Sequence, residues 1–194
     1  MSLWKTLLGP RRSDHSSATG GDEQQASAQA LVDMTGVPAM AGGAPMPFVL
    51  ADEHNVSLFY YLQTHDPNWD GTSVRMVDGS SEGEPAAVIR FNRVLWHRLG
   101  PPNEEAIGAH PLCQLGLHPY TAKEVVGSLA IRDFCHANRI HQYHSDSMFK
   151  GYRHFAIAFH DSVFEAIAYD YSVEELGHKP LLIAAASELG DWKS

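Results

Sequence analysis

Hydrophobic and polar residues alternate along several segments of the chain, and this alternation predicts β-strands. The segments are rich in branched and aromatic residues, and clusters of Pro, Gly and Asp bound them. The clear segments are VSLFYYLQ (56–63), AAVIRFNRVLWHRL (86–99), RHFAIAF (153–159) and VFEAIAY (163–169), and the weaker ones are SVRMV (73–77) and TAKEVV (121–126). The pattern therefore predicts an antiparallel sheet of five or six strands.

Two segments have the spacing of helices instead. Ser128 is a favourable N-cap, and the apolar residues after it recur at helical spacing as far as Cys135, which we expect in the core. A second helix is predicted from Pro180 to Gly190, because proline suits the first turn and glycine terminates a helix. With one or two helices packed on the sheet, the predicted class is α+β.

The first 47 residues differ from the remainder in composition. They are rich in Ser, Ala, Gly, Gln and Pro and contain few residues that could form a core. We therefore expect a flexible tail over 1–47 and a single globular domain over 48–194.

The predicted hairpin over 153–169 has two different faces. If Asp161 and Ser162 form a two-residue turn, opposed residues share a face. The apolar face, expected in the core, carries Phe155, Ile157, Phe159, Phe164, Ala166 and Ala168. The other face carries His154, Ala156, Ala158, His160, Val163, Glu165, Ile167 and Tyr169.

On the second face, this turn makes His160 and Glu165 diagonal neighbours, whose backbone positions lie about 7–8 Å apart across the two strands. A carboxylate beside an imidazole fixes the tautomer of the ring, as in general bases and metal sites. The pair is therefore our candidate for catalysis. The alternative is an ordinary hydrogen-bonded pair on an exposed polar face.

Other histidines could join this pair to hold a metal ion. His110 comes from a long loop, and His141 precedes the hairpin. Three imidazoles and a carboxylate suit a divalent ion such as zinc, iron or manganese. The predicted metal ligands are His110, His141, His154 and His160.

The composition indicates which binding partners and which cellular compartment to expect. The formal net charge of −9, from 14 Lys+Arg and 23 Asp+Glu, argues against nucleic acid as a partner. The two cysteines form no C-x-x-C pair, so neither a disulfide framework nor a thiolate zinc site is indicated, and a cytoplasmic location is expected. No apolar run approaches the roughly 18 residues of a membrane span.

Several motifs between Phe91 and Ala168 resemble a family of bacterial hypothetical proteins. The motifs are HPL, the N-R-x-H run and RHF followed by FHDSxFE, although Ala130 stands where the family pattern has tryptophan. The matching positions are His110, Asn138, Arg139, His141, His154, His160, Asp161, Ser162 and Glu165. The resemblance implies no particular activity. Asn138, Arg139, His144 and Asp161 are further site candidates.

Three functions remain open from the sequence. The first is a domain that binds a small molecule or a protein through the polar face of the 153–169 hairpin. The second is a metal-dependent enzyme, most simply a hydrolase, in which Glu165 acts as base on a metal-bound water. The third is an accessory or immunity-type protein that acts by protein-protein contact, which predicts dispersed histidines and an exposed apolar or acidic patch.

Overall fold

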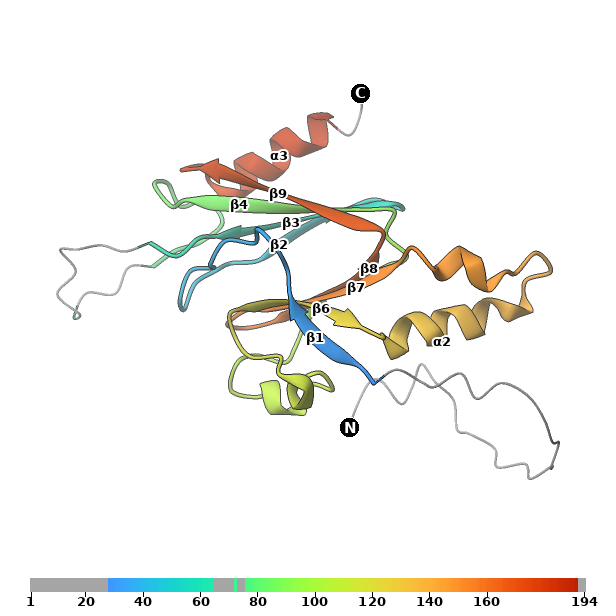
Figure 1. Cartoon of the computed structure of the whole chain (residues 1–194). Helices are drawn as coiled ribbons and strands as arrows, with labels where there is room; N and C mark the ends of the chain where they lie inside the picture. Colours follow the sequence, from blue (N-terminus) through green and yellow to red (C-terminus); the bar gives the residue numbers. More distant parts are fainter. Residues whose placement is uncertain (1–27, 65–71, 73–75, 192–194) are drawn as a thin grey trace.

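The computed structural model describes residues 28–64, 72 and 76–191 (Figure 1). In this part of the chain, antiparallel strands form a five-stranded and a four-stranded sheet, accompanied by two α-helices. The predicted α+β class is confirmed. The strands divide between two sheets that pack face to face.

The five-stranded sheet has the strand order β1-β6-β7-β8-β5. Its strands are β1 (Ala30–Asp33), β5 (Trp96–Gly100), β6 (Thr121–Val126), β7 (Arg153–Ala158) and β8 (Val163–Ala168). The predicted strands over 121–126, 153–159 and 163–169 are confirmed as β6, β7 and β8.

The four-stranded sheet has the order β2-β3-β4-β9. Its strands are β2 (Phe48–Ala51), β3 (Asn55–Tyr61), β4 (Ala86–Asn92) and β9 (Asp170–Gly177). The single strand predicted over 86–99 is wrong, since it divides into β4 and β5 in different sheets. Between them, Arg93 adopts a left-handed conformation with φ of 53°, where the chain passes from one sheet to the other. The strand predicted over 73–77 lies largely outside the described residues.

The main core lies between the two sheets. Alternate residues of β3 and β4 point toward alternate residues of β7 and β8, and all are buried. The ring of Phe91 on β4 lies 5.4 Å from that of Phe155 and 5.3 Å from that of Phe164. The predicted core face of the 153–169 hairpin is confirmed.

Both outer faces of the sandwich are also covered. Helix α3 (Leu181–Asp191) packs on the four-stranded sheet, which confirms the predicted terminal helix. The loop over 101–119, with the 3-10 helices η1 (Ile107–Ala109) and η2 (Cys113–Leu115), packs Leu112 and Leu117 on the five-stranded sheet. Most of the second face of the 153–169 hairpin is therefore buried and is not an exposed polar surface, and only His160 and Tyr169 at its ends are partly exposed.

The folded domain begins earlier than the composition suggested. Strand β1 pairs with β6, and both Met34 and Met40 are buried in the main core. Residues 28–47 are thus part of the domain, because a few apolar residues suffice when the chain pairs with an existing sheet. Residues 1–27 of the predicted tail lie outside the described residues.

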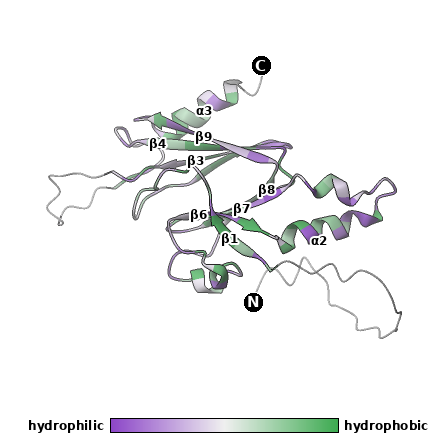
Figure 2. Cartoon of the chain, viewed as in Figure 1, coloured by the Kyte–Doolittle hydropathy of each residue, from purple (hydrophilic) through white to green (hydrophobic). Residues whose placement is uncertain are grey.

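Helix α2 (Leu129–Ala137) begins a helical segment that projects beyond the sheets (Figure 1). It continues through η3 (Asn138–Ile140) and turns back through η4 (Asp146–Phe149). None of residues 129–150, called the arm below, is buried, and hydrophilic residues dominate its far end (Figure 2). The predicted N-cap is confirmed, since the Ser128 hydroxyl accepts a hydrogen bond from the backbone N–H of Ile131 at 3.3 Å. Neither α-helix of the described part is long and apolar enough to cross a membrane.

Candidate metal site

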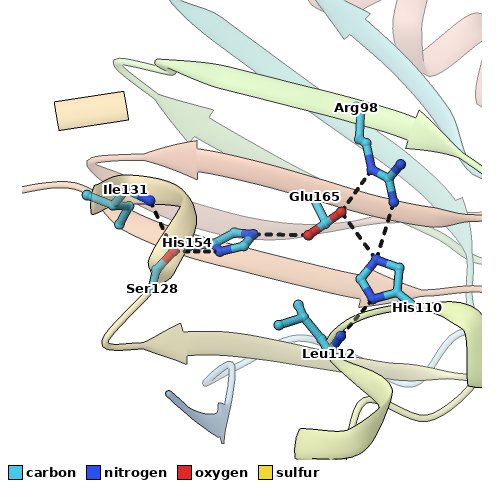
Figure 3. Close-up of polar contacts among 7 residues, drawn as sticks. All are labelled: Arg98, His110, Leu112, Ser128, Ile131, His154 and Glu165. Atoms are coloured by element: carbon cyan, nitrogen blue, oxygen red, sulfur yellow. Dashed lines mark hydrogen bonds and ion pairs between the residues drawn. The ribbon is translucent and has the colours of Figure 1, made fainter. Parts of the chain in front are cut away.

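Two groups of polar side chains contain most of the predicted site residues, and the first surrounds Glu165. Glu165 lies on the outer face of β8, opposite Ala156 of β7 on one side and Arg98 of β5 on the other. Its side chain is enclosed by the 101–119 loop and the start of α2, and the residue is only 2% exposed. Figure 3 shows Arg98, His110 and His154 pointing toward this carboxylate, with Ser128 behind His154.

Three side chains contact the two oxygens of Glu165. Arg98 Nε donates to Oε1 at 2.8 Å, and His110 Nε2 lies 3.3 Å from the same oxygen. His154 Nε2 lies 3.2 Å from Oε2. The other nitrogen of His110, Nδ1, accepts the backbone N–H of Leu112, so Nε2 carries the hydrogen and donates to Glu165.

This arrangement keeps the carboxylate ionised. Burial alone would raise the pKa of Glu165, but the hydrogen bonds from His110 and His154 outweigh it and hold that pKa well below its usual range. A buried carboxylate with donors on both oxygens is stable as an anion and has little tendency to accept a proton. Glu165 is therefore poorly suited to act as a general base.

The hairpin turn is displaced by one residue from the prediction. Phe159 N–H donates to the Ser162 carbonyl at 2.8 Å, so His160 and Asp161 form the turn. Ala158 then pairs with Val163, and the diagonal neighbour of Glu165 is His154 instead of His160. The predicted pairing of a histidine with Glu165 is present, but the predicted partner was wrong.

Ser128, His154 and Glu165 form a chain of contacts that contains the residue types of a hydrolase triad. Ser128 Oγ lies 2.9 Å from His154 Nδ1, and His154 Nε2 faces Glu165. However, Ser128 is 5% exposed, and its hydroxyl already caps α2. A buried hydroxyl that already caps a helix is poorly placed to act as a nucleophile, and the group links the start of α2 to strands β7 and β8.

The four histidines predicted to bind a metal lie in three different places. His110 and His154 contact opposite oxygens of Glu165. His160 contacts the Tyr120 hydroxyl at 2.8 Å and a Glu104 oxygen at 3.2 Å, and the neighbouring Asp161 side chain is exposed. His141 is exposed on the arm, where its Nδ1 accepts the backbone N–H of Tyr143. The structure does not bring these four side chains together.

The second polar group lies on the arm. Cys135 of α2, His144 of the returning loop and Asp146 at the start of η4 place one potential ligand atom each within 4.8 Å of one another. In the part of the chain that the structure describes, no other set of three His, Cys, Asp or Glu side chains meets this condition. This cluster is called the arm site below.

Asp146 connects the members of the arm site. Its Oδ1 accepts from His144 Nε2 at 2.7 Å and from the Cys135 thiol at 3.4 Å. These two hydrogen bonds, with the one from His144 the stronger, lower the pKa of Asp146. Partial burial, followed by the bond to Asp146, raises the pKa of the Cys135 thiol, which is therefore protonated and not an activated nucleophile.

Two neighbouring side chains complete the arm site. Asn138 Nδ2 lies 3.1 Å from His144 Nδ1, and Arg139 Nη2 lies 3.4 Å from Asp146 Oδ2. Three of the further site candidates, Asn138, Arg139 and His144, thus lie together, whereas Asp161 lies on the hairpin turn.

Sequence reasoning missed Cys135 and Asp146. Cys135 was expected in the core, but it is only partly buried and faces Asp146. The spacing C-x8-H-x-D over 135–146 was visible in the sequence. It matches no standard metal motif, because the side chains converge only when η4 folds back along α2.

Comparisons of the chain with protein-family models, curated proteins and solved structures gave no match. The resemblance to bacterial hypothetical proteins therefore stays a prediction, and the candidate site stands on its geometry.

Proposed function

We propose that this protein binds a divalent transition metal ion through Cys135, His144 and Asp146. The observation that carries the proposal is the convergence of a thiol, an imidazole and a carboxylate, which each place one ligand atom within 4.8 Å of the others. Such convergence of thiol, imidazole and carboxylate needs little movement to surround one ion.

The set of ligands favours zinc among the divalent ions. Thiolate and imidazole are ligands of zinc and similar metals, whereas magnesium and calcium prefer sites made only of oxygen. Manganese, another of the metals predicted, prefers carboxylate and water ligands and suits a cysteine-containing site less well, whereas iron accepts thiolate and imidazole as zinc does. Three protein ligands leave a fourth position for water in a tetrahedral site.

The surroundings of His144 support ligation through Nε2. The side chain is 13% exposed, and Asn138 contacts its other nitrogen at 3.1 Å. By rotating its amide, Asn138 can accept the Nδ1–H of a metal-bound imidazole, which fixes the ring in the ligating orientation. Metal binding would replace the thiol proton that Cys135 now shares with Asp146.

The test is equilibrium binding of Zn²⁺ to the untagged protein, measured by calorimetry and by elemental analysis after dialysis. We expect one ion per chain, with affinity reduced about tenfold by Asn138→Ala and reduced further by Cys135→Ser or His144→Ala. Cys113→Ser and His141→Ala are the matched controls, because Cys113 lies on η2 and His141 faces away toward Tyr143. The proposal is wrong if the wild type binds no zinc or if the control variants lose as much affinity as the ligand variants.

A metal-dependent hydrolase remains the second candidate for the activity. The observation that favours it is the exposure of Asp146, whose side chain is 63% exposed and leaves the fourth metal position accessible from solvent. A water bound there would be activated by the ion. Hydrolysis of a simple ester by the zinc-loaded protein, absent from Cys135→Ser, is the measurement that tests this candidate.

A further inference from the structure

Resting on the proposed function, we propose that the metal-loaded arm site binds a small oxyanion, a carboxylate or phosphate group, between the ion and Arg139. Arg139 lies on η3, immediately beyond the helix that carries Cys135. Its guanidinium approaches Asp146 Oδ2, the oxygen opposite the one that His144 and Cys135 contact. The guanidinium therefore lies at the rim of the metal position without occupying it.

The arginine is accessible and incompletely engaged by this contact. The side chains of Arg139 and Asp146 are 57% and 63% exposed. The contact with Asp146 is long, at 3.4 Å, and uses the single nitrogen Nη2. A guanidinium presents two parallel N–H groups to an oxyanion, and such bidentate pairs are stronger than a single long contact.

The charge of the loaded site also favours an anion. A divalent ion (+2), the Cys135 thiolate (−1), the Asp146 carboxylate (−1) and a neutral His144 sum to zero, and Arg139 then makes the site +1. The arm also carries a more positive net charge than the chain as a whole. Residues 129–150 contain three Lys+Arg and two Asp+Glu, whereas the whole chain carries a formal charge of −9.

The fourth metal position supplies the second half of the anion site. A tetrahedral ion with three protein ligands binds one further ligand, either water or an oxygen of a bound molecule. An oxyanion with two oxygens could bind the ion through one and Arg139 through the other. Two such charge-assisted contacts give specificity for planar carboxylates and for phosphates over single-atom anions such as chloride.

The experiment uses the Co²⁺-loaded full-length protein, because the absorption of Co²⁺ responds to its ligands. Acetate and inorganic phosphate are titrated separately, with chloride as a reference anion. We expect a saturable spectral change with at least one oxyanion. We also expect Arg139→Ala to weaken that binding roughly tenfold or more and to change Co²⁺ affinity much less.

Arg132→Ala is the matched control, since Arg132 is also an exposed arginine of the arm. Arg139→Lys should retain part of the affinity, because it keeps the charge but loses the paired N–H groups. The inference fails if the Co²⁺ spectrum ignores both oxyanions or if Arg132→Ala and Arg139→Ala weaken binding equally; in those cases metal binding itself still stands. If no Co²⁺ spectrum forms, the proposed function fails together with the inference.

Discussion

At the scale of single residues, Glu165 connects several segments on the outer face of the five-stranded sheet. It accepts from Arg98, His110 and His154, which come from β5, the 101–119 loop and β7. A buried carboxylate without such donors would strongly destabilise the fold, and buried donors without the carboxylate would destabilise it nearly as much. The same residue types paired on an exposed surface would contribute little to the free energy of unfolding.

Replacing Glu165 by glutamine tests this role. The amide removes the charge and presents an N–H toward a histidine donor, so we expect a loss of about 3 kcal/mol in the free energy of unfolding. Glu174→Gln is the control, because Glu174 pairs with Arg90 in a largely exposed position, and it should cost less than about 1 kcal/mol. Urea denaturation at pH 7 measures both; equal losses would contradict the structural role.

The lowered pKa of Glu165 predicts a dependence of stability on pH. A carboxyl whose pKa is lower in the folded chain stabilises the fold above its unfolded value, 4.5. This contribution is lost as the pH falls from there through the folded pKa. We therefore expect stability to decline below about pH 4.5 more steeply in the wild type than in Glu165→Gln. Parallel declines in urea midpoints between pH 3 and 6 would contradict the assignment.

At the scale of elements, register and chain path determine which predicted residues meet. A shift of one residue in the β7–β8 turn exchanges His160 for His154 beside Glu165. The return of η4 along α2 brings Asp146 to Cys135, although eleven positions separate them. The pairing of β1 with β6 adds residues 30–33 to the sheet despite their weak pattern. Each outcome depends on a partner segment outside the element itself.

The early start of the domain is testable at Met40. This side chain is 4% exposed, and Met40 forms an isolated bridge with Leu62. We expect Met40→Ala to lower the free energy of unfolding by about 2–5 kcal/mol, as for other buried methionines. Met46→Ala is the matched control, because Met46 is 38% exposed. A change at Met40 no larger than at Met46, measured by urea denaturation, would support the later boundary at residue 48.

Two neighbouring residues at the hairpin turn should differ in how much they stabilise the fold. Phe159 is buried in the main core, whereas His160 is partly exposed in the turn. Phe159→Ala should cost about 3–5 kcal/mol, and His160→Ala should cost little because it removes only contacts at the surface with Tyr120 and Glu104. Thermal unfolding of the two variants checks this. Similar losses of stability would mean that Phe159 and His160 do not lie on different faces of the hairpin as described.

At the scale of the whole molecule, the described residues form a two-sheet sandwich with three apolar layers and one projecting arm. The layers lie between the sheets, under α3 and under the 101–119 loop. The ring contact between Trp96 of β5 and Phe134 of α2 fixes the base of the arm against the sheet. The arm site thus lies away from the core, so substitutions of its ligands should change metal binding without unfolding the protein.

The separation of the arm site from the core can be tested by comparing the stabilities of variants. Cys135→Ser and His144→Ala should change the free energy of unfolding of the metal-free protein by less than about 1 kcal/mol, because the positions are not in the core. Phe91→Ala, at the centre of the layer between the sheets, should cost about 3–5 kcal/mol. Denaturation in the presence of a chelator compares them. Losses at Cys135 as large as at Phe91 would show that the arm is part of the main fold.

Features that depend on near neighbours in the chain could be predicted from the order of the amino acids alone. Alternation identified β3, β6, β7 and β8 and the core face of the hairpin, and local capping signals identified α2 and α3. Contacts between distant segments produced the rest: the strands form two sheets, Glu165 is buried with His110 and His154, and Cys135 meets His144 and Asp146. Periodicity indicates which way a side chain points, whereas the groups that it contacts depend on turn register and on segments distant in the chain.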